Sequence, residues 1–123
     1  MNATTATLQR LATRFGIGLL FAWPVLVSAA GGDAELGRRA IERYACVACH
    51  RIPGIPGPPS DVGPPLDHMA RRAYIAGVLG NTPANMERWL RDPPAVDPRT
   101  AMPNLQLSER EARDVAAYLA TLR

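Results

Sequence analysis

The chain has 123 residues, 47% of them hydrophobic, and a formal net charge of +3 at pH 7. All eleven acidic residues follow residue 31, together with twelve of the fourteen arginines, so this part is close to neutral and lacks the basic surface of a nucleic-acid-binding protein. Residues 31–123 are enough for one domain but few for a self-sufficient hydrophobic core, so we expect another component to help the fold.

Residues 1–30 have the pattern of an export signal. Their only charges are Arg10 and Arg14, which precede a stretch of apolar and small residues. The pattern predicts a signal peptide that is cleaved at the alanines ending it. An uncleaved membrane anchor is the alternative, because the apolar run is intermediate in length between a signal core and a membrane span. In both cases residues 31–123 would lie outside the cytoplasm, so we expect a periplasmic domain.

Four segments of the exported part have helical periodicity. Ser108 and Glu111 form a capping-box pattern ahead of an apolar helical face. Thr82 and Pro83 are a typical N-cap and first-turn pair, and a proline pair stops that helix after Arg91. The expected helices are 34–45, 67–77, 82–91 and 108–122, of which the second is less well marked. No alternating strand pattern is present, so the predicted fold class is all-α.

A proline-rich loop separates the first two helices. Residues 51–65 read "RIPGIPGPPSDVGPP", which can sustain neither a helix nor a central strand. Loops of this length in a small domain usually bind something or carry a function.

The stretch "CVACH", residues 46–50, contains both cysteines of the chain and one of its two histidines. A disulfide in an exported domain would account for the cysteines but not for His50. A thioredoxin-like pair needs a βαβ context, which is absent. Zinc could take four ligands if His68 joined them, but Cys49 and His50 are adjacent and the spacing does not fit a finger.

The spacing C-x-x-C-H has a specific chemical use, the covalent attachment of haem. Each thiol, Cys46 and Cys49, adds to one vinyl group, and the imidazole of His50 then binds the iron. The export signal, the small core and the long loop all agree with this interpretation. The sequence therefore predicts one haem c per chain, which would supply the missing core.

Residues 33–123 resemble a class I cytochrome c domain and are most similar to the cytochrome c domain of subunit II of caa-type cytochrome oxidases. The segments that carry the resemblance are "CVACH", "VGPPLDHMARR", "NTPANMERWL" and "AMPNLQLSEREARDVAAYLATL". It implies a small fold of three to five helices with irregular loops around one covalently bound haem, so we expect a signal segment over 1–30 and a monohaem domain over 31–123. The sequence holds no copper-binding domain, which favours a free-standing or singly anchored carrier.

Met102 is the candidate for the sixth iron ligand. It lies in an extended segment ahead of the capped last helix, and its position matches the axial methionine of the family. A core gap-filler is the alternative role for this side chain. Met69 and Met86 fall in expected helices, where methionine usually packs, and His68 is the rival nitrogen ligand.

The resemblance also implies roles around the haem. The backbone carbonyl of Pro64 would accept the second N–H of the ligand histidine, and Leu66 would pack on the porphyrin. Arg72 and the indole of Trp89 occupy positions that donate to the haem propionates, although a solvated arginine and a core tryptophan are the alternatives. In the family the first and last helices cross, and we expect Gly37 to allow close approach to the region of Ala116 and Tyr118.

These features predict a one-electron carrier rather than an enzyme. A quinol-oxidising complex or a dehydrogenase would be the donor and a terminal oxidase the acceptor, and we expect a monomer that docks through arginines such as Arg51, Arg71 and Arg99. One alternative is a haem enzyme or gas-binding protein with an open sixth position. Another is a bound cytochrome subunit of a dehydrogenase or oxidase complex, which would touch the membrane if residues 1–30 were retained.

Overall fold

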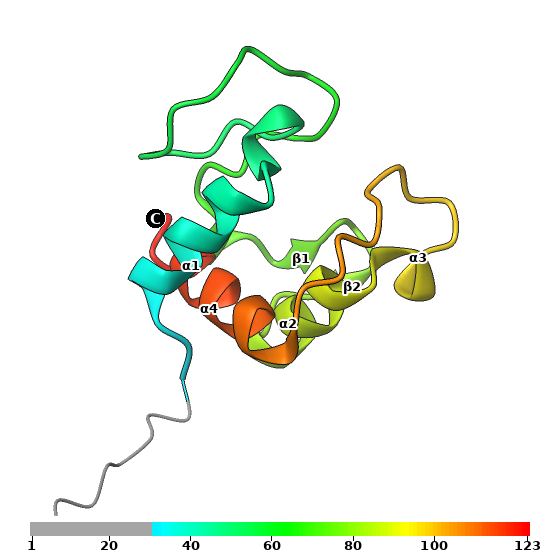
Figure 1. Cartoon of the computed structure of the whole chain (residues 1–123). Coiled ribbons are helices and arrows are strands. Elements are labelled where there is room, and N and C mark those ends of the chain that lie inside the picture. The colour runs from blue at the N-terminus through cyan, green and yellow to red at the C-terminus, as the bar shows by residue number, and fades with distance from the viewer. Residues whose placement is uncertain (1–30) are drawn as a thin grey trace, which may run out of the picture.

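The structure of the chain is a computed structural model that describes residues 31–123 (Figure 1). The signal peptide or anchor expected over residues 1–30 lies outside this range. Among the described residues, no helix is long and apolar enough to span a bilayer. The elements are α1 (Ala34–Arg43), the 3-10 helices η1 (Cys46–Ala48) and η2 (Met69–Arg71), strands β1 (Tyr74–Ile75) and β2 (Leu79–Gly80), and helices α2 (Pro83–Arg91), α3 (Pro93–Val96) and α4 (Glu109–Leu119).

Side-chain caps start the three longer helices. The carboxylate of Asp33 accepts the N–H groups of Glu35 and Leu36 at the start of α1, at 2.8 and 3.0 Å. Thr82 caps α2, with Pro83 in its first turn, and Ser108 caps α4. The helices predicted over 34–45, 82–91 and 108–122 are therefore confirmed, with the first and last somewhat shorter than expected.

Helices α1 and α4 pack together at very short range. A Cβ atom at Gly37 would lie 2.0 Å from the Asp114 carbonyl oxygen, so only glycine allows this approach. The contact falls at Asp114 and Val115, rather than nearer Ala116 as expected. The carboxylate of Asp114 is itself buried and accepts the backbone N–H of Asp33 at 2.8 Å, which fixes the start of α1 against α4.

Glu111 joins the same two helices through its carboxylate. Its Oε2 accepts hydrogen bonds from Ser108 N at 2.9 Å, Ser108 Oγ at 2.7 Å and the Tyr44 hydroxyl at 2.9 Å. Its Oε1 accepts a bond from Arg43 Nη2 at 2.6 Å. The bonds from Ser108, followed by that from Tyr44, lower the pKa of Glu111 to about 2, so the group stays ionised near neutral pH.

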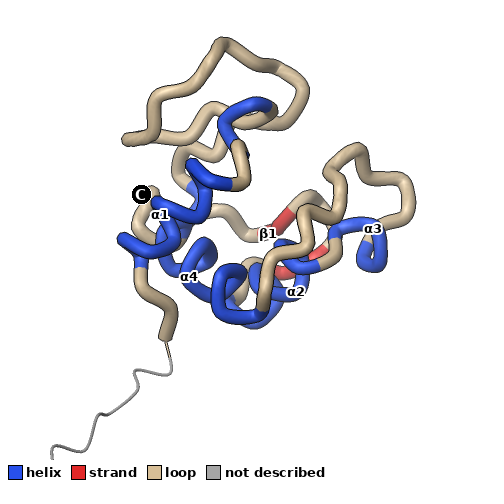
Figure 2. Tube along the Cα trace, viewed as in Figure 1, coloured by secondary structure: helices blue, strands red, loops and turns tan. Residues whose placement is uncertain are grey.

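The hydrophobic core lies between α1, α2, α4 and the short hairpin. Figure 2 shows that α1, α2 and α4 gather together and that long loops project from them, with α3 set apart beside one of these loops. The buried apolar residues are Ala40, Ile41, Ile52, Ile55, Met69, Ile75, Met86, Trp89, Leu90, Leu107, Ala112, Val115, Ala116, Leu119 and Leu122.

The prediction of a helix over 67–77 is wrong. In its place are the single turn η2 and an antiparallel hairpin in which Tyr74 pairs with Gly80. The hairpin turn has φ of 51° at Ala76 and 75° at Gly77, the pattern of a type I′ turn. Asn81 favours this structure because its Nδ2 donates to two carbonyl groups of the η2 segment, at 2.8 and 2.9 Å.

Helix α2 ends at Arg91 as predicted, and a new helix follows it at once. Pro93 begins the single-turn helix α3, which the sequence did not predict. Asp92 caps this turn through a bond from Ala95 N at 3.4 Å, and proline in the first turn needs no N–H partner. A proline pair thus ends one helix and begins the next.

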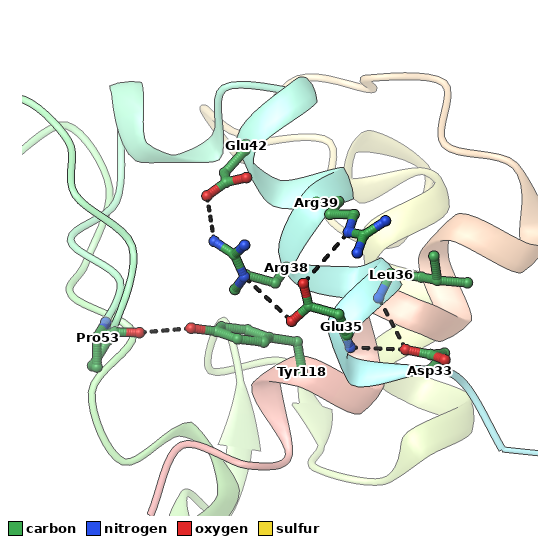
Figure 3. A network of polar contacts seen from close by, with 8 residues as sticks. All are labelled: Asp33, Glu35, Leu36, Arg38, Arg39, Glu42, Pro53 and Tyr118. Atoms are coloured by element: carbon green, nitrogen blue, oxygen red, sulfur yellow. Dashed lines mark hydrogen bonds and ion pairs between the residues drawn. The ribbon is translucent and has the colours of Figure 1, made fainter.

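The proline-rich loop is fastened to α4 by Tyr118. Figure 3 shows the Tyr118 side chain beside Arg38, with its hydroxyl directed at Pro53. The hydroxyl donates to the Pro53 carbonyl at 2.8 Å, and Ile52 pairs with Ile55 in an isolated bridge. Arg38 also bridges Glu35 and Glu42 on the exposed face of α1, at 3.4 and 2.6 Å. The start of the loop is therefore tied to the helical core.

Replacing Ala76 with Asn should stabilise the protein. The left-handed conformation is energetically unfavourable for alanine at this exposed turn. Asn-Gly is the preferred residue pair of a type I′ turn. We expect the free energy of unfolding to rise by about 0.5–1 kcal/mol, as measured by denaturant titration. Ala73→Asn, an exposed neighbour without positive φ, should give no such gain. An equal gain at both sites would contradict the turn argument.

Replacing Glu111 with Gln should lower the thermal midpoint near neutral pH. The folded-state pKa of about 2 lies below the ordinary value of 4.5, so ionised Glu111 stabilises the fold fully above pH 4.5 and loses this contribution as the pH falls towards 2. The groups on α1 that face Glu111 are the Arg43 guanidinium and the Tyr44 hydroxyl, and the bond with Glu111 raises the pKa of Tyr44, so this hydroxyl stays protonated.

The difference in thermal midpoint between wild type and Glu111→Gln should therefore shrink on acidification. Glu109→Gln removes an exposed partner of Arg113 on α4 and serves as the control. A wild-type advantage that stayed constant down to pH 2 would show that the charge of Glu111 is not responsible.

Candidate haem site

The cysteines lie in one tight turn immediately after α1. Tyr44 caps the helix, and Ala45, with φ of 53°, turns the chain into η1. The N–H groups of Cys49 and His50 both donate to the carbonyl of Cys46, at 3.2 and 3.0 Å. The local backbone therefore groups two thiols and an imidazole within a single turn.

Both cysteines are free thiols in the described part of the chain. Each is half-buried, and burial raises the pKa of Cys46, so this thiol is protonated near neutral pH. Within residues 31–123, no three His, Cys, Asp or Glu side chains come together as a metal-ion site. The geometry thus offers neither a disulfide nor a zinc cluster around His50 and His68.

The ring of His50 is oriented by the backbone of the loop that faces it. Nδ1 lies 2.7 Å from the carbonyl oxygen of Pro64, and because a carbonyl can only accept, Nδ1 carries the hydrogen. In this tautomer the lone pair is on Nε2, as a metal ligand requires. A carbonyl partner for the second ring nitrogen is the usual support of a metal-bound histidine.

Gly63 makes this contact possible. A Cβ atom at residue 63 would lie 2.5 Å from Cε1 and 2.7 Å from Nδ1 of His50, so only glycine fits against the ring. The N–H of Gly63 donates to the Cys49 carbonyl at 2.8 Å, and the N–H of Leu66 donates to the Arg51 carbonyl at 2.9 Å. The loop therefore lies alongside the cysteine segment as a second layer of backbone.

The middle of the proline-rich loop packs against Val47 in the cysteine turn. A Cβ atom at Gly57 would lie 2.5 Å from Cβ of Val47, the residue between Cys46 and Ala48. Near the end of the loop, Arg51 Nη2 lies 2.8 Å from Asp67 Oδ2. This buried oxygen has the charge contact but no hydrogen bond among the described residues. The loop and the C-x-x-C-H turn thus form one unit.

Met102 lies in the second long loop, between α3 and α4. Its side chain is partly buried against the core, and its N–H donates to Thr100 Oγ1 at 3.2 Å. Figure 1 shows this loop and the cysteine-bearing segment projecting from the helical core at separate places. Met69 and Met86 are each only 5% exposed and are core side chains, whereas His68 is exposed with φ of 55°.

The other predicted site residues lie in these same surroundings. Leu66 is half-buried against the core. Arg72 Nη2 donates to the carbonyls of Pro65 and Asp67 at 2.6 and 2.9 Å, so this guanidinium already supports the loop. Trp89 is buried in α2, and its indole N–H donates to none of the described residues.

Sequence reasoning missed three supports of the site, which are Gly63, Tyr118 and the Arg51–Asp67 pair. Gly63 is one of several glycines in a glycine- and proline-rich loop, so its neighbour in space could not be read from the sequence. Tyr118 fits the helical periodicity of α4, and no neighbouring residue indicates that its hydroxyl bonds to the loop.

These residues fit a covalently bound haem. Two free thiols on one turn can form the two thioether bonds, and the fixed tautomer of His50 leaves Nε2 for the iron. The Gly63 backbone provides the close support that a ligand imidazole requires.

Comparison with known proteins agrees with a haem-binding site. Residues 34–123 match the Cytochrome c family. Cytochrome c oxidase subunit 2 of Alkalihalophilus pseudofirmus is 33% identical over 91 residues, 73% of this chain and 26% of the relative. The same subunit of Bacillus sp. strain PS3 is 29% identical over 104 residues, 81% of this chain and 28% of the relative. The chain spans about a quarter of the length of these curated relatives.

Solved structures agree on the fold. Cytochrome c2 from Rhodobacter sphaeroides superposes with a TM-score of 0.53 at 19% identity, covering 74% of this chain and 96% of that one. Cytochrome cH from Methylobacterium extorquens gives a TM-score of 0.52 at 26% identity, covering 73% and 99%.

The predicted fold class and the resemblance to the oxidase-linked cytochrome domains are thus confirmed. Covalently bound haem c is the cofactor that the match implies, and the two free cysteines of the C-x-x-C pattern agree with it. The chain therefore belongs to the cytochrome c family.

Proposed function

We propose that the chain is a one-electron carrier with a single haem c. Cys46 and Cys49 would hold the porphyrin, and His50 Nε2 and the Met102 sulfur would be the axial ligands. The observation that carries this proposal is the bond between His50 Nδ1 and the Pro64 carbonyl, with Gly63 against the ring. This arrangement leaves the Nε2 lone pair free for iron.

Rigid ligands suit electron transfer. The bound haem would supply the reversible one-electron chemistry of its iron. The chain supplies the support: His50 is fixed by a carbonyl, and the Gly63 N–H ties the supporting loop to Cys49 at 2.8 Å. A thioether from Met102 would favour ferrous iron and raise the potential relative to a second histidine.

Leu66, Arg72 and Trp89 would complete the haem surroundings. Leu66 offers an apolar surface next to the supporting loop. The Nε and Nη1 atoms of Arg72 make no hydrogen bond within the described residues, so these donors can serve a propionate while Nη2 holds the loop. The indole N–H of Trp89 can do the same.

The partners follow from the relatives and from the charges. The curated relatives are named as cytochrome c oxidase subunits, which supports a terminal oxidase as electron acceptor. A quinol-oxidising complex or a dehydrogenase would be the donor in the periplasm. Arg51 is paired with Asp67 and Arg99 with Asp97, so of the arginines expected to guide docking only Arg71 lacks an ion-pair partner in the described region.

A bound subunit of an oxidase complex is the second candidate function. It is favoured by the same relatives, in which the matching part belongs to an oxidase subunit. Mass spectrometry of native protein would decide between the two, because retention of residues 1–30 indicates an anchored subunit and their loss a diffusing carrier.

Replacing Met102 with Ala should abolish the near-infrared band that a methionine sulfur gives with ferric iron. It should also lower the midpoint potential by on the order of 0.1 V, within the ~0.8 V range set by axial ligands, and open the ferrous form to carbon monoxide. Met86→Leu changes a buried methionine of the core and should leave all three properties unchanged. An unaltered spectrum in Met102→Ala would contradict the proposed ligation by Met102. It would favour an open sixth position or one bound by histidine.

Replacing Gly63 with Ala should push the loop away from His50, because the new methyl group would overlap the ring. We expect a loss of about 1–3 kcal/mol in stability and faster solvent exchange of the His50 Nδ1 proton, measured by NMR. Gly80→Ala is the matched control, since nothing lies within 4 Å of a Cβ atom there. Equal proton exchange in both variants would show that Gly63 does not support the ring.

A further inference from the structure

The carboxylate of Glu111 makes contacts that a helix cap does not need. Its bonds to the N–H and hydroxyl of Ser108 complete the capping box of α4. The bonds from the Tyr44 hydroxyl at 2.9 Å and Arg43 Nη2 at 2.6 Å come from the other helix, 67 and 68 residues away in the chain. The Glu111 side chain is 27% exposed, and the bond from Tyr44 is partly buried whereas that from Arg43 is exposed.

The α1 partner of Glu111 adjoins the cysteine segment. Tyr44 is the C-cap of α1, and only Ala45 separates it from Cys46. Ala45 is held in the left-handed conformation with φ of 53°. The position of the Tyr44 side chain therefore fixes the point where the C-x-x-C-H turn begins.

The α4 partner of Glu111 adjoins the methionine segment. Ser108 directly follows residues 98–107, which contain no helix or strand. Every hydrogen bond that residues 98–107 make within the described part of the chain goes to a residue at most three positions away. Leu107 is buried in the core and Met102 and Leu105 pack against it, so apart from these apolar contacts the placement of Met102 depends on how the two ends of the segment are anchored.

We propose that Glu111 is a positioning residue of the haem site, because one carboxylate ties the start of the cysteine-bearing turn to the end of the methionine-bearing loop. The inference rests on the proposed ligation by His50 and Met102. Loss of the carboxylate would leave α4 helical but would free the end of the loop from α1. Met102 would then leave the iron more easily.

The test measures how readily an external ligand displaces Met102. Haem-loaded protein is titrated with imidazole in the ferric state, and loss of the near-infrared methionine band is followed. Glu111→Gln removes the charge, and Tyr44→Phe removes only the bond from α1 and leaves the capping box intact. Asp33→Ala is the control, because it removes the cap of α1 without touching either haem-bearing segment.

The apparent affinity for imidazole should rise about tenfold in Tyr44→Phe, as expected for one lost hydrogen bond to a charged group, and by a similar factor in Glu111→Gln, where a neutral amide replaces the charged acceptor of both bonds from α1. Asp33→Ala should lower the thermal midpoint comparably but leave the affinity at the wild-type value. An unchanged affinity in both test variants, or an equal rise in Asp33→Ala, would overturn the positioning role. A wild-type spectrum without the methionine band would overturn the ligation itself, and this inference with it.

Discussion

The close packing of α1 on α4 is the contact on which the site depends. Gly37 lets the backbone of one helix reach the Asp114 carbonyl of the other, and the buried Asp114 carboxylate fixes the start of α1. The C-x-x-C-H turn leaves the end of α1, and the Met102 segment enters the start of α4. The geometry of one helix pair therefore sets the relation between the two segments that would hold a haem.

The proline-rich loop keeps a defined structure without helices or strands because several contacts attach it to the rest of the domain. The proline-rich loop is attached at Pro53 by Tyr118, packs through Gly57 on Val47, and is bonded through Gly63 to Cys49. The loop also places the side chains of Ile52 and Ile55 in the hydrophobic core. The loop is thus a fixed part of the site and does more than connect two helices.

The features that could be predicted from the sequence depend on neighbouring residues. Those that could not be predicted depend on contacts between segments far apart in the chain. The capped helices and the C-x-x-C-H chemistry were accessible because a cap, a proline or a thiol spacing acts over a few residues. The hairpin after η2 was missed because its strands have two residues each, too few for alternation to appear. Gly63 and Tyr118 were missed because their roles depend on partners up to 65 residues away.

Pairing the first helix with the last has a consequence for how the chain matures. Such a topology depends on contacts between residues far apart in the chain, which slow folding. Until α4 is present, Gly37 has no helix to pack on, so the turn that bears Cys46 and Cys49 is not yet held in place. Both ends of the described chain are therefore needed before this turn takes its final position.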